Sequence, residues 1–235
     1  MLTIVIPTKD EERYLPQLLA SISRQTVQPS EIIVADASSS DRTRELAASG
    51  GAKIVEGGPV AIGRNRGAAC ATGEFILFLD ADVELSDRAF IEKALCEMHE
   101  KNLGLATCDV MPLSDSRIDH FLHKAYNRYA RAWGSRVPHA PGFCLLVRRA
   151  LHEQLGGFDE RVVFCEDHDY ARRFRRVGTF GFLRSVQVPV SIRRLDRDGR
   201  LRLALTYVLA ELHLLFLGPI RHNLFHYTFG HAPRE

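Results

Sequence analysis

Residues 75–82 read Phe-Ile-Leu-Phe-Leu-Asp-Ala-Asp, and this stretch decides the fold. Five consecutive apolar residues that end abruptly predict a strand buried on both faces, as in a parallel sheet covered by helices. Two carboxylates, Asp80 and Asp82, follow at once. Because residues i and i+2 at a strand end point the same way, we expect both carboxylates to face one ligand.

The segments around this strand alternate between strand and helix patterns. Strands are predicted at residues 2–6, 31–35, 53–55, 75–79 and 103–108, and helices at residues 11–24, 41–48, 59–71 and 87–101. Such alternation predicts an α/β fold with a mostly parallel, Rossmann-like sheet and helices on both faces.

The second half of the chain has a different pattern. Helices are predicted at residues 119–133, 149–155, 166–176 and 201–217, and strands at residues 143–147 and 187–192. We divide the chain into residues 1–105, a smaller lobe of residues 106–198, and a C-terminal helix and tail of residues 199–235. The connecting loops are short, so we expect the parts to share one body.

Bulk properties narrow the classes of protein. The net charge of +2 gives no support to nucleic-acid binding. The five cysteines have no metal-knuckle spacing, their number is odd, and no secretion signal precedes the first strand. These features predict a reducing, cytoplasmic setting. The longest apolar stretch, residues 203–217, is too short and too polar to predict a membrane span.

Polar clusters follow three of the predicted strands, namely PTKDE at residues 7–11, DASSSD at residues 36–41 and DAD at residues 80–82. Ligands of open α/β sheets bind outside the carboxyl ends of the strands, so the clusters should converge. Converging carboxylates repel one another unless a cation satisfies them, and hard oxygen ligands favour Mg²⁺ or Mn²⁺ shared with phosphates. The alternative is that the DAD triplet only ends a strand and caps the next helix.

An ordered set of motifs, taken together, resembles the family 2 glycosyltransferases, which have the GT-A nucleotide-sugar fold. The motifs are IVIPTKDEE at residues 4–12, VADASSSDRT at 34–43, RNRG at 64–67, ATGE at 71–74, FLDAD at 78–82, GGFDE at 156–160 and EDHD at 166–169. The resemblance implies that residues 1–105 bind a nucleotide-diphosphate sugar and that residues 106–198 bind the acceptor and carry a catalytic base.

The resemblance also implies residue roles on the donor side. Residues expected to line the nucleobase and ribose pocket are Pro7, Thr8, Glu11 and Asp36. Arg64 would approach the nucleotide, and Asn65 would shape the turn beside it, so both count among the expected substrate-binding residues. UDP is the default nucleotide, and GDP is the alternative.

The metal is assigned to the DAD triplet by the same resemblance. Asp80 would lie near the ribose and the metal, and Asp82 would bind Mn²⁺ or Mg²⁺ directly. Two departures, Asp10 where the family usually has Asn and Ala37 where a second acid is common, affect the expected base specificity and not the metal.

Inverting transfer, which the resemblance implies, needs one base that accepts the proton of the acceptor hydroxyl. Asp167, in the Glu166-Asp167 pair, matches the family's base motif, and Glu166 is an expected substrate contact. The first turn of the 166–176 helix also favours an ionised carboxylate. The alternative is that these acids only cap the helix.

Further residues have weaker assignments. Asp169 is expected to pair with Arg173 four residues later, and Asp159 is a second candidate for the base. Arg193 and Arg194 either reach a diphosphate or a phosphorylated acceptor, or are ordinary solvated charges.

The helix at residues 201–217 has leucines around most of its circumference. Glu211 falls opposite Arg202 on the expected helix and argues against a clean amphipathic pattern. The helix either lies on a membrane near a lipid-linked acceptor or packs on the body or a partner subunit. The acceptor is open between a glycan, a lipid-linked molecule and a small molecule.

Two other functions remain open. A sugar-phosphate nucleotidyltransferase would use a similar half but is expected to carry a glycine-rich phosphate loop where this chain has residues 7–11. A non-catalytic nucleotide-sugar-binding protein would use the same fold without the base.

Overall fold

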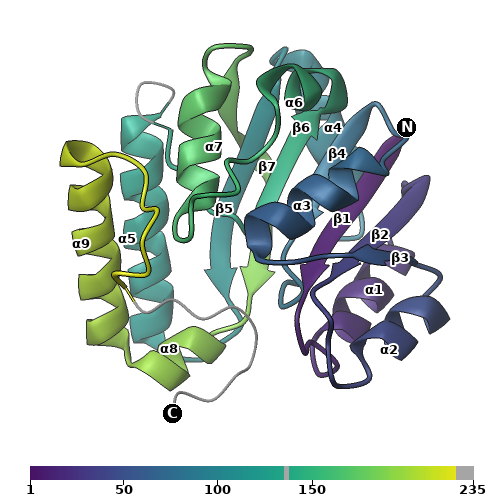
Figure 1. The fold of residues 1–235 in the computed structure, drawn as a ribbon, viewed down its shortest axis with the longest axis horizontal. Helices are drawn as coiled ribbons and strands as arrows, with labels where there is room; N and C mark the ends of the chain where they lie inside the picture. The colour runs from purple at the N-terminus through teal and green to yellow at the C-terminus, as the bar shows by residue number, and fades with distance from the viewer. Residues whose placement is uncertain (135–137, 226–235) are drawn as a thin grey trace.

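The computed structural model describes residues 1–134 and 138–225, which form one sheet between two helical layers (Figure 1). Within these residues the sheet has seven strands in the order β3-β2-β1-β4-β6-β5-β7. The strands are β1 (Leu2–Thr8), β2 (Glu31–Asp36), β3 (Lys53–Glu56), β4 (Phe75–Leu79), β5 (Leu105–Pro112), β6 (Cys144–Arg148) and β7 (Phe180–Val190). The sheet is mostly parallel, as the strand and helix pattern predicts.

The four N-terminal strands are all parallel, and β1 lies between β2 and β4. Every residue of β1 and β4 is buried, which explains why β4 reads as an unbroken apolar run and β1 as a mostly apolar one. β6 pairs antiparallel with β4 on one side and with β5 on the other. It therefore joins the two halves of the chain into one sheet.

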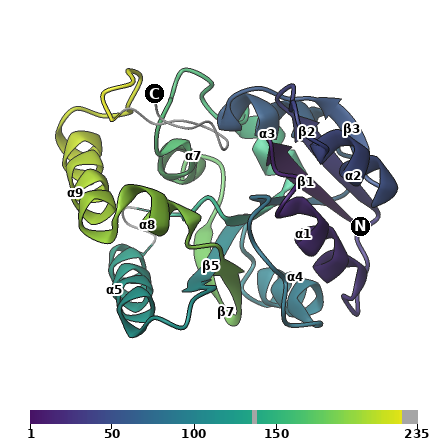
Figure 2. The same cartoon turned by 90° about the horizontal axis from the view of Figure 1, so that it is seen from below.

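The helices cover both faces of this sheet. They are α1 (Leu15–Ser23), α2 (Thr43–Ser49), α3 (Val60–Ala69), α4 (Phe90–Glu100), α5 (Arg117–Trp133), α6 (Arg149–Leu155), α7 (Glu166–Phe174), α8 (Arg193–Asp198) and α9 (Arg200–Phe216). In Figure 2, α1 and α4 lie on one side of the sheet and α3 and α7 on the other, with α5, α8 and α9 gathered at the far end.

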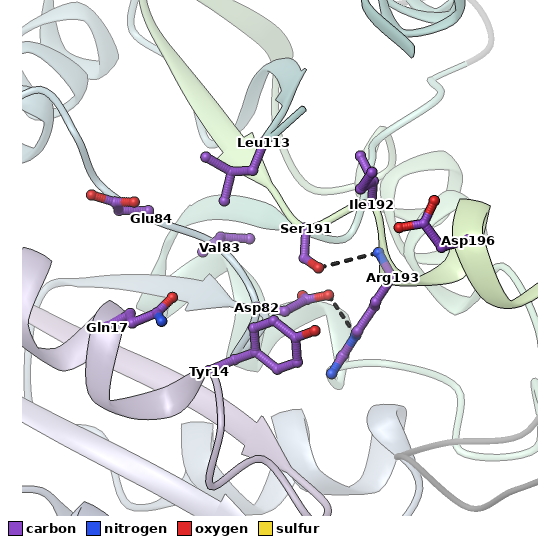
Figure 3. A pocket seen from close by; sticks show the side chains of 10 residues that line it. All are labelled: Tyr14, Gln17, Asp82, Val83, Glu84, Leu113, Ser191, Ile192, Arg193 and Asp196. Carbon is purple, nitrogen blue, oxygen red and sulfur yellow. Dashed lines mark hydrogen bonds and ion pairs between the residues drawn. The ribbon is translucent and has the colours of Figure 1, made fainter. Parts of the chain in front are cut away.

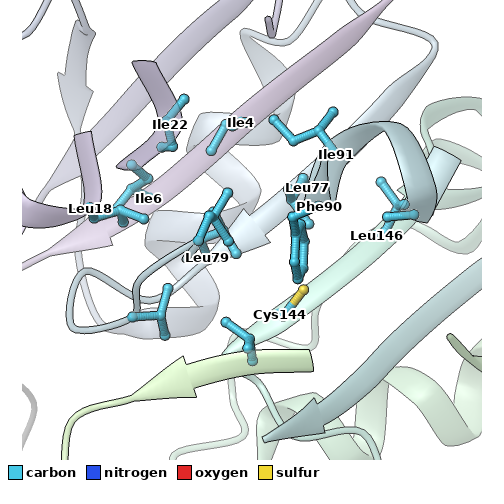
Figure 4. Close-up of a cluster of buried hydrophobic side chains, with 14 of the residues drawn as sticks. Ile4, Ile6, Leu18, Ile22, Leu77, Leu79, Phe90, Ile91, Cys144 and Leu146 are labelled. Carbon is cyan, nitrogen blue, oxygen red and sulfur yellow. The ribbon is translucent and has the colours of Figure 1, made fainter. Parts of the chain in front are cut away.

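Each face has its own apolar core. On one face, Leu18 and Ile22 of α1 and Phe90 of α4 pack over Ile4 and Leu77, as Figure 4 shows. On the other face, α3, α6 and α7 pack over the opposite side of the same strands. Truncating a buried phenylalanine such as Phe90 to alanine would cost about 3–5 kcal/mol of stability.

Some predicted boundaries were wrong. α1 begins at Leu15 rather than near residue 11. The backbone amides of Asp10 and Glu11 donate instead to Ser39 and Thr43, so the turn before α1 serves the loop after β2.

β7 begins at Phe180 rather than near residue 187 and pairs with all of β5, with a register shift between Cys108 and Asp109. The short helix α8 was not predicted. Within residues 1–134 and 138–225, no helix is both long enough and apolar enough to cross a bilayer.

Candidate active site

The strand ends that carry polar clusters do meet. Thr8 at the end of β1 lies in register with Asp36 at the end of β2, and its hydroxyl donates to Asp36 Oδ2 at 3.0 Å. The loops that follow are held in an unusual conformation, because Asp10 and Ser38 have positive φ angles of 53° and 58°. Asp tolerates this region, and such residues often cluster at functional sites.

Asp36 is fully buried and has a complete set of partners. Burial alone would raise the pKa of this carboxyl, but hydrogen bonds from Ser39, Arg44 and Thr8 lower it overall. The carboxylate is therefore charged and fixed in place. Its expected contact with a nucleobase stays a prediction.

β4 delivers the DAD triplet to the same edge, and β7 brings an arginine to it. Residues after β4 run beside the end of β7, since Ser191 N donates to Asp82 O at 3.0 Å and Val83 bridges Val190. Arg193, two residues further on, therefore lies at the triplet. The sequence had left open whether this arginine was merely solvated, and its side chain is only 25% exposed.

Arg193 joins two of the predicted site carboxylates, Glu11 and Asp82, and Figure 3 shows its contact with Asp82. Its Nε lies 2.8 Å from Asp82 Oδ2, and its Nη1 and Nη2 donate to the two oxygens of Glu11 at 2.7 and 2.8 Å. The guanidinium also lies over the Tyr14 ring, 4.9 Å from its centroid. A positive charge therefore sits between the acids of two strand ends.

A cavity of about 270 Å³ opens beside this pair, lined in part by Tyr14, Asp82, Ser191 and Arg193. Burial raises the pKa of Asp82 to about 7, and repulsion from Asp80 and Glu11 acts in the same direction, while Arg193 opposes it. A nearby cation would stabilise the charged form of this carboxylate.

A second arginine joins the two halves of the chain. Arg64 on α3 is 1% exposed, and its Nη2 and Nη1 donate to Asp80 at 2.9 Å and to Glu166 at 2.8 Å. Its Nη2 also donates to the carbonyl of Gly142 at 2.9 Å. Burial disfavours the charge, but the surrounding carboxylates raise the pKa of Arg64 overall.

Asp167 lies against this bridge at the start of α7. The residue before the helix, Cys165, has a positive φ of 57°, and the His168 amide donates to Asp167 Oδ1 at 2.8 Å. The loop passes so close that a Cβ on Gly142 would lie 2.7 Å from Asp167 Oδ2. Burial raises the pKa of Asp167 to about 6, although Arg64 lowers it. This value suits a base near neutral pH.

The structure thus brings most of the predicted residues together. Glu11 and Asp82 share Arg193, Asp80 and Glu166 share Arg64, and Thr8 holds Asp36. Pro7 is buried in β1, in register with Ala35.

The Asn65 side chain forms hydrogen bonds with the protein backbone. Its Oδ1 accepts from Phe158 N at 2.8 Å, and its Nδ2 donates to Phe158 O at 2.9 Å. It ties α3 to the loop before α7. Its expected contact with substrate stays a prediction.

Two further expectations concern acids outside the centre. Asp169 pairs with Arg173 at 2.7 Å, which confirms the expected i,i+4 pair. Asp159 pairs with Arg161 and Arg221, neither of which belongs to the Arg64 bridge.

Sequence reasoning missed the pairing of Arg193 with Glu11 and the close approach of Gly142. The IRR motif at residues 192–194 was a signal for the first. Nothing local to Gly142 signalled the second, which depends on residues far away in the chain.

The described part of the chain holds no group of three or more His, Cys, Asp or Glu side chains arranged for a metal ion. Magnesium-type sites that share ligands with a substrate's phosphates need only one or two protein carboxylates. Asp80 and Asp82 meet that requirement, and the cation of Arg193 already lies against Asp82. The residues present therefore fit a divalent ion that arrives with a diphosphate.

Comparison with known proteins gives one family for most of the chain. The family model "Glycosyl transferase family 2" matches residues 3–156. The 4,4'-diaponeurosporenoate glycosyltransferase of Staphylococcus haemolyticus is 31% identical over 134 residues, which are 53% of this chain and 34% of that protein. The O-antigen chain rhamnosyltransferase WbaN of Salmonella anatum is 25% identical over 193 residues, 75% of this chain and 61% of that one. The matched part of the chain thus spans about a third to three fifths of these relatives.

Solved structures share the fold. The mannosyltransferase PcManGT from Pyrobaculum calidifontis, in complex with GDP-Man and Mn²⁺, has a TM-score of 0.69 at 22% identity over 90% of this chain and 63% of that one. Residues 1–349 of S. aureus TarS, in complex with UDP, have a TM-score of 0.63 at 19% identity over 81% of this chain and 60% of that one. These neighbours are GT-A glycosyltransferases, so the predicted GT-A fold is confirmed.

Proposed function

Because this chain belongs to glycosyltransferase family 2, we propose that it moves a sugar from a nucleotide-diphosphate sugar, by default a UDP-sugar, to an acceptor hydroxyl with inversion. Residues 1–105 would bind the donor, and residues 106–198 would bind the acceptor and supply the base. The neighbours described above include enzymes solved with UDP and with GDP-Man, which supports this donor class.

The observation that carries the proposal is the Arg64 bridge. One buried guanidinium holds Asp80 from the donor half and Glu166 from the acceptor half, at 2.9 and 2.8 Å. Asp167 follows directly, with a pKa raised to about 6 by burial. A direct displacement needs the leaving diphosphate on one side of the sugar and a base on the other, and the bridge between the two halves supports that division of roles.

In the proposed mechanism, Asp167 accepts the acceptor's proton as the hydroxyl oxygen attacks the anomeric carbon and the bond to the diphosphate breaks. Arg64 holds Asp80 and Glu166, the neighbour of Asp167, and its charge limits the rise in the pKa of Asp167. Thr8, Glu11 and Asp36 would orient the nucleoside. Asp82 and Asp80 would hold Mn²⁺ or Mg²⁺, which would supply charge stabilisation for the leaving diphosphate.

The proposal also includes a cellular location for the reaction, which depends on the acceptor. We place the reaction in the cytoplasm, at the inner face of a membrane if the acceptor is lipid-linked. Residues 199–235 would make that contact. No nucleic-acid partner is proposed, because the net charge is only +2.

A thermal-shift panel of UDP- and GDP-sugars, each with and without Mn²⁺, tests the donor. We expect one donor to raise the melting temperature only when Mn²⁺ is present. A parallel assay of pyrophosphate exchange separates the rival nucleotidyltransferase. Exchange without sugar transfer would overturn the proposal.

A further inference from the structure

Helix α9 carries its apolar side chains on the outside of the molecule. Outward residues that are 46–85% exposed are Leu201, Leu205, Val208, Leu209, Leu212, Leu215 and Phe216. Positions 201, 205, 208, 212 and 215 repeat at helical spacing, so they form one stripe along the helix. A helix on the surface of a soluble protein normally buries its apolar side chains and exposes its charged ones.

The single acid of this helix points inward. Glu211 lies 2.8 Å from His139 Nε2, 3.3 Å from His168 Nδ1 and 3.5 Å from Arg172 Nη2. The prediction that Glu211 interrupts the apolar face was therefore wrong. The residue anchors α9 to α7 and leaves the outer stripe uninterrupted.

Helix α5 has the same arrangement and lies beside α9 at the same end of the molecule in both views (Figures 1 and 2). Its single acid, Asp119, is fully buried and pairs with Arg200 at the start of α9. Ile118, Phe121 and Trp133 of α5 are exposed by 61%, 69% and 44%. We call the outer sides of α5 and α9 together the apolar surface.

The exposed charges of these two helices are all positive. They are Arg117, Lys124 and Arg128 on α5 and Arg202 on α9. An outer surface of leucines and aromatic residues with only arginine and lysine among its charges matches the interface of an anionic bilayer.

We propose that the apolar surface docks this protein on a membrane that contains anionic phospholipid. The leucine stripe would enter the boundary between headgroups and acyl chains, and the cations would lie among the lipid phosphates. Each cation near such a surface strengthens binding by about fivefold, so the interaction weakens with salt.

A second copy of the chain fits this surface poorly. A symmetric pair would bring each surface against itself, and no exposed carboxylate on either helix could face the four cations. Facing like charges across an interface disfavours association. An anionic bilayer satisfies both the apolar and the charged groups.

Docking would also orient the reaction, and this step rests on the proposed function. Glu211 contacts His168, the neighbour of Asp167, so the surface is about one helix diameter, ~10 Å, from the base. The acceptor side of the site would then lie near the bilayer, which suits a hydroxyl on a lipid-linked molecule.

Co-flotation of the full chain with vesicles tests the docking without any assay of transfer. We expect the full chain to bind phosphatidylcholine vesicles that contain about 30% phosphatidylglycerol, which gives a strongly anionic surface. It should bind only weakly to vesicles of phosphatidylcholine alone. The double variant Leu205→Gln/Leu212→Gln should lose binding about tenfold or more, and Lys124→Gln/Arg128→Gln should lose about tenfold or more.

The matched control is Val27→Gln/Arg88→Gln, which changes one exposed apolar residue and one exposed cation outside both helices. It should bind as the parent does, and all variants should keep the parent melting temperature. Absent flotation of the parent chain, or equal losses in the control, would overturn the proposal. So would a parent dimer in light scattering that Leu205→Gln/Leu212→Gln dissociates.

Discussion

Replacing Gly142 with alanine should displace the proposed base, Asp167, without changing that residue itself. The added Cβ would lie 2.7 Å from Asp167 Oδ2 and 2.9 Å from Arg64 Nη2, where ordinary contacts begin at 3.4 Å. Asp167 must therefore move by about 0.7 Å, and Arg64 resists because it is held by Asp80 and Glu166. Misplacement of a catalytic group by about 1 Å costs on the order of 100-fold in rate.

Steady-state kinetics on Gly142→Ala should show kcat reduced by about 10- to 100-fold, with the KM for the donor changed less than about threefold. Gly178→Ala is the matched control, since its Cβ would meet the Phe174 ring at 2.8 Å, in the core of the α3 and α7 face. That variant should lose stability and keep kcat per folded molecule. An unchanged kcat in folded Gly142→Ala, or equal losses in both variants, would refute the reasoning.

Three further predictions concern the charged groups. Burial raises the pKa of Asp167 to about 6, so kcat/KM should be constant above pH 7 and fall about tenfold by pH 5. A profile that stays flat over this range would exclude Asp167 as the base. Arg193→Gln should raise the affinity for Mn²⁺ about tenfold or more in electron paramagnetic resonance titrations without donor, because the arginine no longer competes with the ion for Asp82. The control Arg88→Gln should leave the affinity unchanged. A lower Mn²⁺ affinity in Arg193→Gln would show that the arginine does not compete with the ion. Arg64→Met should cost about 3–5 kcal/mol in denaturant unfolding because it leaves two partly buried carboxylates without their fully buried cation. Arg66→Met, two residues along α3 and 49% exposed, should cost less than about 1 kcal/mol; similar losses in the two would contradict the bridge.

Much of the fold was readable because it depends on local pattern. The apolar run at residues 75–79 and its neighbours predict buried parallel strands, and all four N-terminal strands are found where expected. Element ends were less predictable. The start of α1 is set by amides that bind Ser39 and Thr43, which lie more than 25 residues away.

The convergence of the predicted site residues was readable from the sequence, but their pairings were not. The strand ends of β1, β2 and β4 had to converge, which brings Thr8, Asp36 and Asp80 to one edge. Which cation each acid meets depends on the long β7 strand that carries Arg193 across to Glu11, 182 residues away in sequence. The direction of Glu211 depends likewise on how α9 docks on α7.

The most direct measurement compares Asp167→Asn with the parent chain in donor binding and in single-turnover transfer. Calorimetric titration with the donor and Mn²⁺ should give dissociation constants within about threefold of each other, while transfer falls by about 100- to 10,000-fold. Transfer at the parent rate in Asp167→Asn would contradict the central claim that this carboxylate takes the acceptor's proton. Equal loss of binding and transfer would contradict it too, because the residue would then serve donor binding instead.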